Sequence, residues 1–189
     1  MCSPTRRDLH RLKRLGRYLK GRPRLVQMFV WQDLYDKYDM YVDSDWAGDR
    51  DTRKSTSAGA IYGGAHVNRT WSKDQDIIAT SSAEAELHAA SYGAMQLKGL
   101  QSISIDLGRE LRGHIHIDAS AAIGVMKRQG LGKLRHIQVR DLWLQQEIKE
   151  GRLHVHKVDT KANPADLGTK PLSKEEVERH VHAMGLTWK

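Results

Sequence analysis

Four acidic residues carry the strongest chemical signal in this sequence. Asp43 and Asp118 each end a short alternating run, Glu86 opens an expected helix, and Asp166 follows Asn163-Pro164-Ala165 at another expected helix start. Carboxylates at strand ends and helix starts can converge although the sequence scatters them. Four that converge repel one another unless cations neutralise them. Their hard oxygen ligands suit Mg²⁺, for which Mn²⁺ can substitute, and two such ions can clamp the attacking and leaving oxygens of a phosphodiester.

Each acid taken alone has a simpler explanation. Asp43 and Asp118 can terminate strands, Asp166 can start a helix, and Glu86 can sit in a first turn where the helix dipole favours it. Glu86, however, shares the apolar face of its helix with Ala90, and an acid on a buried face costs free energy unless it is paired. The order and settings of the four together favour a metal centre over four separate structural roles.

Length and charge limit the class of protein. The 189 residues are enough for one domain with appendages, and Cys2 is the only cysteine, which excludes a disulfide framework. The sequence contains no signal-peptide pattern and no apolar stretch long enough to span a membrane, so we expect neither secretion nor a membrane location. The net charge of +8 arises in residues 1–25, which hold nine Lys or Arg and one acid. A basic segment of this kind favours an anionic partner, although a solvated helix face is the commoner explanation of a basic run.

Apolar periodicity predicts a series of helices and strands. A leucine stripe in 5–20 predicts a helix that needs a partner surface, either on the following domain or in a polypeptide that this chain lacks. The expected strands are 25–31, 39–45, 57–63, 66–72, 114–118 and a segment through 153–158. The other expected helices are one of five turns after a capping pattern at 81–84, then 121–126, 136–150, a short one near 163, and 173–185.

The order of these elements predicts the fold class. Three leading strands with short links indicate an antiparallel meander, and the later alternation of strands with helices indicates parallel crossovers. We therefore expect an α/β fold built on a mixed five-stranded sheet with helices on both faces.

A series of motifs resembles a known family. They are Asp43-Ser44-Asp45-Trp46-Ala47-Gly48-Asp49, Arg53-Lys54-Ser55-Thr56-Ser57, Thr80-Ser81-Ser82-Ala83-Glu84-Ala85-Glu86, Asp118 with Ala122-Ile123, Arg135-His136-Ile137, and Asn163-Pro164-Ala165-Asp166 with Thr169-Lys170-Pro171-Leu172. In this order they resemble the ribonuclease H domain of copia-type LTR retrotransposon Pol polyproteins. The resemblance implies a ribonuclease-H-like domain over 39–172, a trailing piece of the reverse transcriptase over 1–38 and an amphipathic tail over 173–189.

The resemblance also implies an activity. It is Mg²⁺-dependent endonucleolytic hydrolysis of the RNA strand of an RNA–DNA hybrid, by a two-metal mechanism with Asp43, Glu86, Asp118 and Asp166 as catalytic and metal-binding residues. Asp43 would bridge both ions, Glu86 and Asp118 would complete one ion's shell, and Asp166 the other's. The implied partners are the hybrid and a reverse transcriptase polymerase domain. The implied location is intracellular, in the cytoplasm, a virus-like particle or the nucleus.

Two assignments stay open within the motifs. Asp45 lies two residues from Asp43 and faces the same way on a strand, and Glu84 lies two residues before Glu86. We prefer Asp43 because its strand ending matches that of the family. We prefer Glu86 because Glu84 fits the capping role.

The sequence departs from the family at two positions. The Asn that usually follows the third acid is Ala119 here, which weakens the order expected around Asp118. The mobile His that cellular relatives carry before the last acid is missing from 159–163, and His136 is a candidate for its role by proximity only. These departures favour a competing hypothesis, a decayed or repurposed domain that binds hybrid without cutting it or packs on a polymerase. An integrase is a third hypothesis, but the order of the acids argues against it.

Two further groups of side chains are candidates for binding. Contacts to nucleic acid are expected from basic side chains near the third and fourth helices, namely Lys127, Arg128, Lys133, Arg135, His136 and Arg140; exposed solubility charges explain them equally well. Three His-x-His pairs, at 114/116, 154/156 and 180/182, have the residue types for Zn²⁺. No common spacing links the pairs, so we expect ordinary strand and helix histidines.

Overall fold

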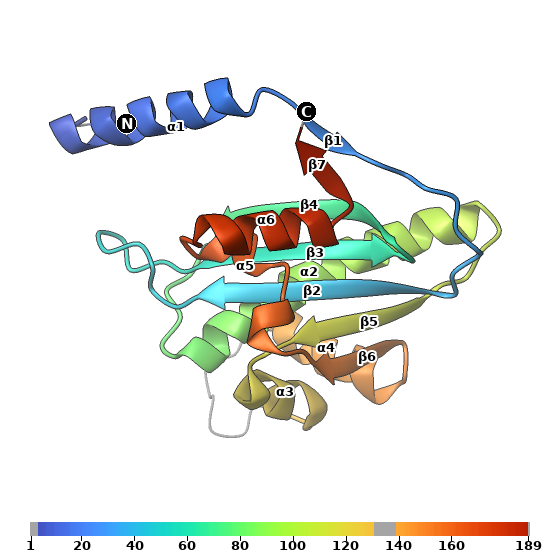
Figure 1. Ribbon diagram of the computed structural model, residues 1–189. Helices are drawn as coiled ribbons and strands as arrows, with labels where there is room; N and C mark the ends of the chain where they lie inside the picture. The colour runs from blue at the N-terminus through green and yellow to red at the C-terminus, as the bar shows by residue number, and fades with distance from the viewer. Residues whose placement is uncertain (1–3, 131–138, 189) are drawn as a thin grey trace.

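The computed structural model describes residues 4–130 and 139–188. Its core is a five-stranded mixed sheet in the order β4-β3-β2-β5-β6 (Figure 1). The pairs β2–β3 and β3–β4 are antiparallel, and β2–β5 and β5–β6 are parallel. The elements, in chain order, are α1 Arg6–Gly21, β1 Leu25–Gln27, β2 Lys37–Asp45, β3 Thr56–Gly63, β4 His66–Asp74, α2 Ser82–Asp106, β5 Arg112–Ile117, α3 Ser120–Lys127, α4 Val139–Lys149, β6 Leu153–Lys157, the 3₁₀ turn η1 Thr160–Ala162, α5 Asp166–Thr169, α6 Lys174–Ala183 and β7 Leu186–Trp188.

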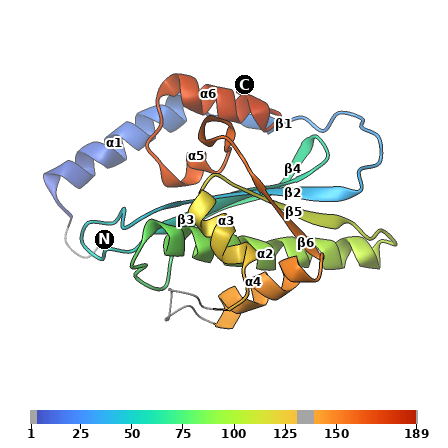
Figure 2. The same ribbon diagram turned by 90° about the horizontal axis from the view of Figure 1, so that it is seen from below.

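Helices cover both faces of the sheet, as predicted. Helices α2, α3 and α4 lie on one face, and α5 and α6 on the other (Figure 2). The main core lies under α2, where Met40 and Val42 of β2 and Ile115 and Ile117 of β5 are fully buried. Because side chains alternate along a strand, Asp43, His114 and His116 point to the opposite face.

The long helix α2 begins where the sequence predicts. Ser81 is its N-cap, and the Ser81 side chain accepts a hydrogen bond from the backbone N–H of Glu84 (3.2 Å). The Glu84 carboxylate in turn accepts hydrogen bonds from the backbone and the side chain of Thr80, at 2.7 and 2.6 Å. These contacts fix the first turn of α2, which directly precedes Glu86.

Two predicted elements are shorter in the structure, and the helix predicted with five turns is longer, because α2 continues to Asp106. The strand expected over 25–31 is limited to Leu25–Gln27, because β1 pairs only with the three residues of β7. The helix expected over 173–185 ends at Ala183, and the chain turns at Gly185 (φ 69°) into β7. Apolar residues predicted the longer strand and the longer helix. The pairing of β1 with β7 limits β1 to three residues and requires α6 to end before β7 begins. The first residues of the helix predicted over 136–150 lie outside the described residues, and α4 is described from Val139.

Helix α1 does not bury its leucine stripe. None of its residues is buried, and the exposed side chains include Leu9, Leu12, Leu15 and Leu19. Its C-terminal end is attached to the tail: Arg22 forms an ion pair with Glu178 (2.7 Å) and stacks on Trp188. No helix within the described ranges combines the length and the apolar content needed to cross a lipid bilayer.

Helix α5 packs very closely on the sheet at Gly168. A Cβ added there would lie 2.5 Å from the Cβ of Ala58, which is buried in β3 and has no flexible end that can move away. We expect Gly168→Ala to displace α5 and to lower the free energy of unfolding by about 1–3 kcal/mol. The control is Gly124→Ala in α3, where an added Cβ meets nothing within 4 Å. Denaturant unfolding should show a loss for Gly168→Ala and no loss for Gly124→Ala; equal stability of the two variants would contradict the close approach.

Candidate active site and metal centre

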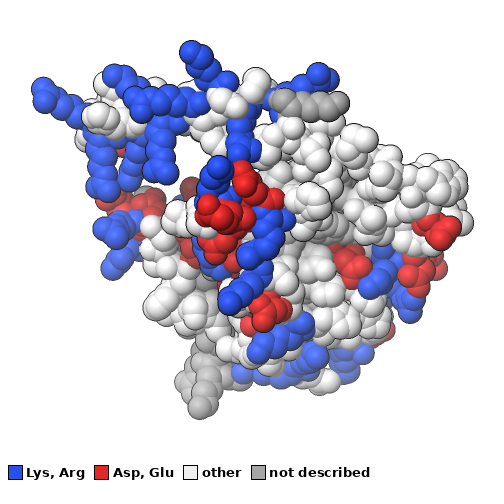
Figure 3. Space-filling model, in the orientation of Figure 1, with Lys and Arg blue, Asp and Glu red and all other residues white. Residues whose placement is uncertain are grey.

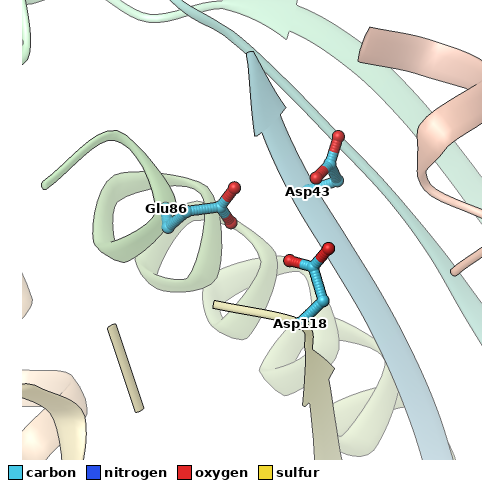
Figure 4. Close-up of side chains that lie close together, drawn as sticks. All are labelled: Asp43, Glu86 and Asp118. Carbon is cyan, nitrogen blue, oxygen red and sulfur yellow. The ribbon is translucent and has the colours of Figure 1, made fainter. Parts of the chain in front are cut away.

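Three of the four predicted acids converge at one end of the sheet. Asp43 lies on β2, Glu86 in the first turns of α2, and Asp118 directly after β5, and one carboxylate oxygen from each lies within 4.8 Å of the others (Figure 4). The parallel pairing of β2 with β5 explains the approach of the two aspartates. Tyr41 is paired with His116 in this register. Asp43 lies two residues after Tyr41 and Asp118 two residues after His116, so the two aspartates lie side by side.

The group is buried and electrostatically unfavourable without a cation. Asp43 is 1% exposed and Glu86 6% exposed. One Glu86 oxygen accepts a hydrogen bond from the backbone N–H of Ser44 (3.2 Å), and the other is buried with no hydrogen-bond partner among the described residues. Burial, together with the charges of Asp43 and Asp118, raises the pKa of Glu86 to about 8. An unpartnered oxygen inside a group of acids is a feature that cation binding would relieve.

The donor set fits a hard divalent cation. Oxygens bound at about 2.1 Å around one Mg²⁺ lie at most about 4.2 Å apart, so the three acids need only a small side-chain adjustment to bind a single ion. All three offer carboxylate oxygens, the ligand type that Mg²⁺ and Mn²⁺ prefer. Asp43, Glu86 and Asp118 are therefore suitable ligands.

Asp166 lies beside this group rather than within it. It is the first residue of α5, and Lys170 at the other end of that helix donates hydrogen bonds to Asp166 Oδ1 (2.8 Å) and Asp43 Oδ1 (3.2 Å). Thr169 also donates to the Asp43 carboxylate through its hydroxyl. Burial raises the pKa of Asp166, although the hydrogen bond from Lys170 opposes the shift. Lys170 thus links the fourth acid to the first.

The two open alternatives have other contacts. Asp45 accepts a hydrogen bond from the backbone N–H of Thr56 on β3, which holds the end of the β2–β3 pair. Glu84 holds Thr80 at the start of α2. Neither belongs to the group of three acids.

Sequence reasoning gave no role to Lys170 and Thr169, although both belong to the quoted motif at 169–172. The signal was the spacing: Lys170 follows Asp166 by four residues, which places their side chains on one helix face. Thr160 was also missed. Its hydroxyl donates to Asp118 Oδ2 (2.8 Å) from the η1 turn, the segment where cellular relatives are expected to carry a mobile histidine.

The departure at Ala119 has a visible consequence. Ala119 is the N-cap of α3 and makes no side-chain capping hydrogen bond, a contact that an Asn could supply. Asp118 accepts a side-chain hydrogen bond from Thr160, across the strand ends.

The candidate nucleic-acid contacts are only partly described. Lys127 ends α3 with an exposed side chain, and Arg128 follows it, half-buried. Lys133, Arg135 and His136 lie outside the described residues. Arg140 lies in α4, and its side chain is outside the described set.

Comparison with known proteins identifies the relatives of this chain. It is 30% identical over 190 residues, 99% of its length, to the retrovirus-related Pol polyprotein from transposon RE1 of Arabidopsis thaliana. It is also 30% identical over 187 residues, 97% of its length, to that from transposon TNT 1-94 of Nicotiana tabacum. The chain is homologous to a segment of copia-type Pol polyproteins. It spans only 13% and 14% of those two Pol polyproteins. No family model matches the chain.

The fold of this Pol-related segment also has solved counterparts. An RNase H1 isolated from compost superposes on it with a TM-score of 0.51 and 15% sequence identity, covering 77% of this chain and 99% of the other. The strand order, the mixed pairing and this superposition establish a ribonuclease-H-like fold. In the Pol-related segment, the carboxylate group lies where the neighbouring strands β2 and β5 end and α2 begins.

Proposed function

We propose that this chain hydrolyses the RNA strand of RNA–DNA hybrids in a reaction that requires Mg²⁺, as part of retrotransposon reverse transcription. The observation that carries the proposal is the buried group of Asp43, Glu86 and Asp118, whose oxygens lie within 4.8 Å of one another. The ribonuclease-H-like fold and the homology to Pol polyproteins point to the same activity.

The four acids have separate tasks in this proposal. Asp43 is central because it lies between the other two acids of the group and the pair formed by Asp166 and Lys170. Glu86 and Asp118 complete the ligand set on one side, and Asp166 supplies the carboxylate on the other. Bound Mg²⁺ would activate the attacking water and stabilise the leaving 3′-oxygen. Glu86 holds a proton at neutral pH in the cation-free site, so it must release that proton to act as a ligand.

Lys170 acts as the internal counter-charge of the site. Burial lowers the pKa of Lys170, but the hydrogen bond to Asp166 and the charges of Asp43 and Asp166 outweigh burial and raise this pKa above its usual value. The Lys170 side chain therefore stays cationic. We expect Lys170→Met to lower the free energy of unfolding in EDTA by about 1–3 kcal/mol, because two buried carboxylates lose a charged hydrogen-bond donor. Added Mg²⁺ should recover part of this loss. Thermal unfolding in EDTA and in Mg²⁺ measures both effects, and the exposed Lys149→Met serves as the control.

Helix α1 supplies a surface for the rest of a longer polypeptide. Its apolar stripe is uncovered within the described residues, and basic side chains gather on the same helix at the upper left of Figure 3. We assign the exposed stripe to contact with a reverse transcriptase polymerase domain, because the relatives are Pol polyproteins of which this chain covers a small share. This favours the second alternative for the stripe, that its partner lies outside this chain.

The test of the proposed function is a cleavage assay on a hybrid whose RNA strand is labelled. We expect 5′-phosphate products with Mg²⁺ or Mn²⁺, none with EDTA, and no cleavage of the DNA strand or of duplex DNA. Retained binding without cleavage in Mg²⁺ would support the competing function, a domain that binds hybrid without cutting it. The missing cap at Ala119 and the neutralisation of two acids by Lys170 are the observations that favour that competitor.

A further inference from the structure

The sheet brings two of the three His-x-His pairs together. Strands β5 and β6 are parallel neighbours, and their register places His114 opposite His154 and His116 opposite His156. All four imidazoles lie on the face opposite the α2 core, because Ile115 and Val155 between them point into that core. The pairs that no sequence spacing connects are thus joined by strand register into one histidine cluster, comprising His114, His116, His154 and His156.

Two imidazoles in this cluster already stand at the separation of ligands on one ion. His156 Nε2 lies 3.0 Å from His114 Nδ1, and the two rings share a hydrogen bond that a bound cation would replace. Two nitrogens bound at about 2.05 Å to one tetrahedral Zn²⁺ lie about 3.3 Å apart, so the observed separation needs little change. Burial, together with the charges of Lys37 and His156, lowers the pKa of His114 to about 4.

A third imidazole is held by a carboxylate. His116 Nε2 lies 2.7 Å from Asp39 Oδ1, and the His116 ring stacks on that of His156 with centroids 5.2 Å apart. Hydrogen bonds from His116 and Lys37 outweigh burial and lower the pKa of Asp39 to about 2. A charged carboxylate accepts a hydrogen bond from the Nε2–H of His116 and leaves Nδ1 as the ligand atom, the usual way in which proteins orient metal-binding histidines.

We propose that β5 and β6 carry a second metal site, selective for a borderline transition-metal cation such as Zn²⁺, in which His114 and His156 are ligands and His116, oriented by Asp39, is the third. In the structure the three imidazoles do not all lie within reach of one ion, so a shift of the His116 side chain that keeps its Asp39 contact, together with a solvent molecule, completes the coordination. Its nitrogen donors separate this site from the oxygen-only group at Asp43, which suits Mg²⁺.

An ion at this site would bind the edge strand β6 to its neighbour. Strand β5 leads directly to Asp118, and β6 leads to Thr160, which donates its hydrogen bond to Asp118. A cross-strand ion therefore fixes the two segments that position one acid of the carboxylate group.

The experiment is Zn²⁺ titration of the full chain by calorimetry, in an Asp43→Asn background that weakens the acid site. We expect one Zn²⁺ per chain and a rise in the temperature of unfolding with Zn²⁺ concentration. His114→Gln and His156→Gln should each abolish saturable binding, and Asp39→Asn should weaken it by about tenfold or more. The matched control is His182→Gln, an exposed histidine of the third pair on α6, which should leave binding unchanged.

A second measurement does not depend on the folding of these histidine variants. The electron paramagnetic resonance spectrum of Cu²⁺ bound to the Asp43→Asn chain should show coupling to nitrogens from two or more imidazoles on one ion. Oxygen coordination alone would overturn the proposal. So would the absence of stoichiometric Zn²⁺ binding, or unchanged binding in folded His114→Gln and His156→Gln variants.

Discussion

Asp43→Asn should reduce the rate of RNA cleavage in a hybrid by about a thousandfold, which corresponds to roughly 4 kcal/mol of transition-state stabilisation. The amide keeps the size of the carboxylate, but its single oxygen can accept only one of the two hydrogen bonds that Thr169 and Lys170 donate to separate oxygens of Asp43. It removes the negative charge at the centre of the acid group. Single-turnover cleavage assays with saturating Mg²⁺ would measure the change in the chemical step.

The matched control is Asp45→Asn, two residues along the same strand. An amide oxygen can replace the Asp45 carboxylate as the acceptor for the Thr56 backbone N–H, so we expect a change in rate of less than about tenfold. A large loss at Asp45 with a small loss at Asp43 would reverse the assignment. Equal and small losses at both would remove the acid group from the reaction.

Glu86→Gln should abolish a pH dependence of stability in the cation-free protein. The pKa of Glu86 is about 8 in the folded chain against 4.5 for an ordinary glutamate. Between these values the folded state holds a proton that the unfolded state has released, so stability falls as pH rises. The loss approaches about 1.4 kcal/mol per pH unit inside this window and stops above it.

The measurement is denaturant unfolding in EDTA from pH 5 to pH 9. The parent chain should lose stability relative to Glu86→Gln as pH rises, and the variant should be the more stable of the two at pH 8. Mg²⁺ should reduce the difference, because a cation stabilises the ionised glutamate. The control is Glu110→Gln, whose side chain is exposed. Parallel pH curves for the parent and Glu86→Gln would contradict the raised pKa.

Local sequence patterns predicted the framework because they depend on neighbours in the chain. The alternation around Met40 and Val42 and the capping pattern at Ser81 located β2 and the start of α2 within two residues, whereas the far end of α2 lies beyond the five turns that were expected. The convergence of Asp43, Glu86 and Asp118 was also anticipated, but only from the ordered motifs, since spacing alone does not bring distant acids together. The remaining expected roles of the four acids stay predictions until cleavage is measured.

Features that depend on partners across the sheet were less accessible. Asp43 and Asp45 share a strand face, and the Thr56 contact that distinguishes them comes from the register of β3. The histidine pairs looked unrelated because their proximity depends on how β5 aligns with β6. The strand predicted at 25–31 was too long because its length depends on β7.

The pairing of β1 with β7 also determines how this unit connects to a longer polypeptide. Leu25 stands opposite Trp188, so the chain enters the compact part at the place where it leaves (Figure 1). Polypeptide that joined this unit at either end would therefore connect to it at the same place. A unit with adjacent ends can be inserted into a larger protein without separating the segments of that protein on either side of it. The edges of the five-stranded sheet then stay available for contacts with other domains.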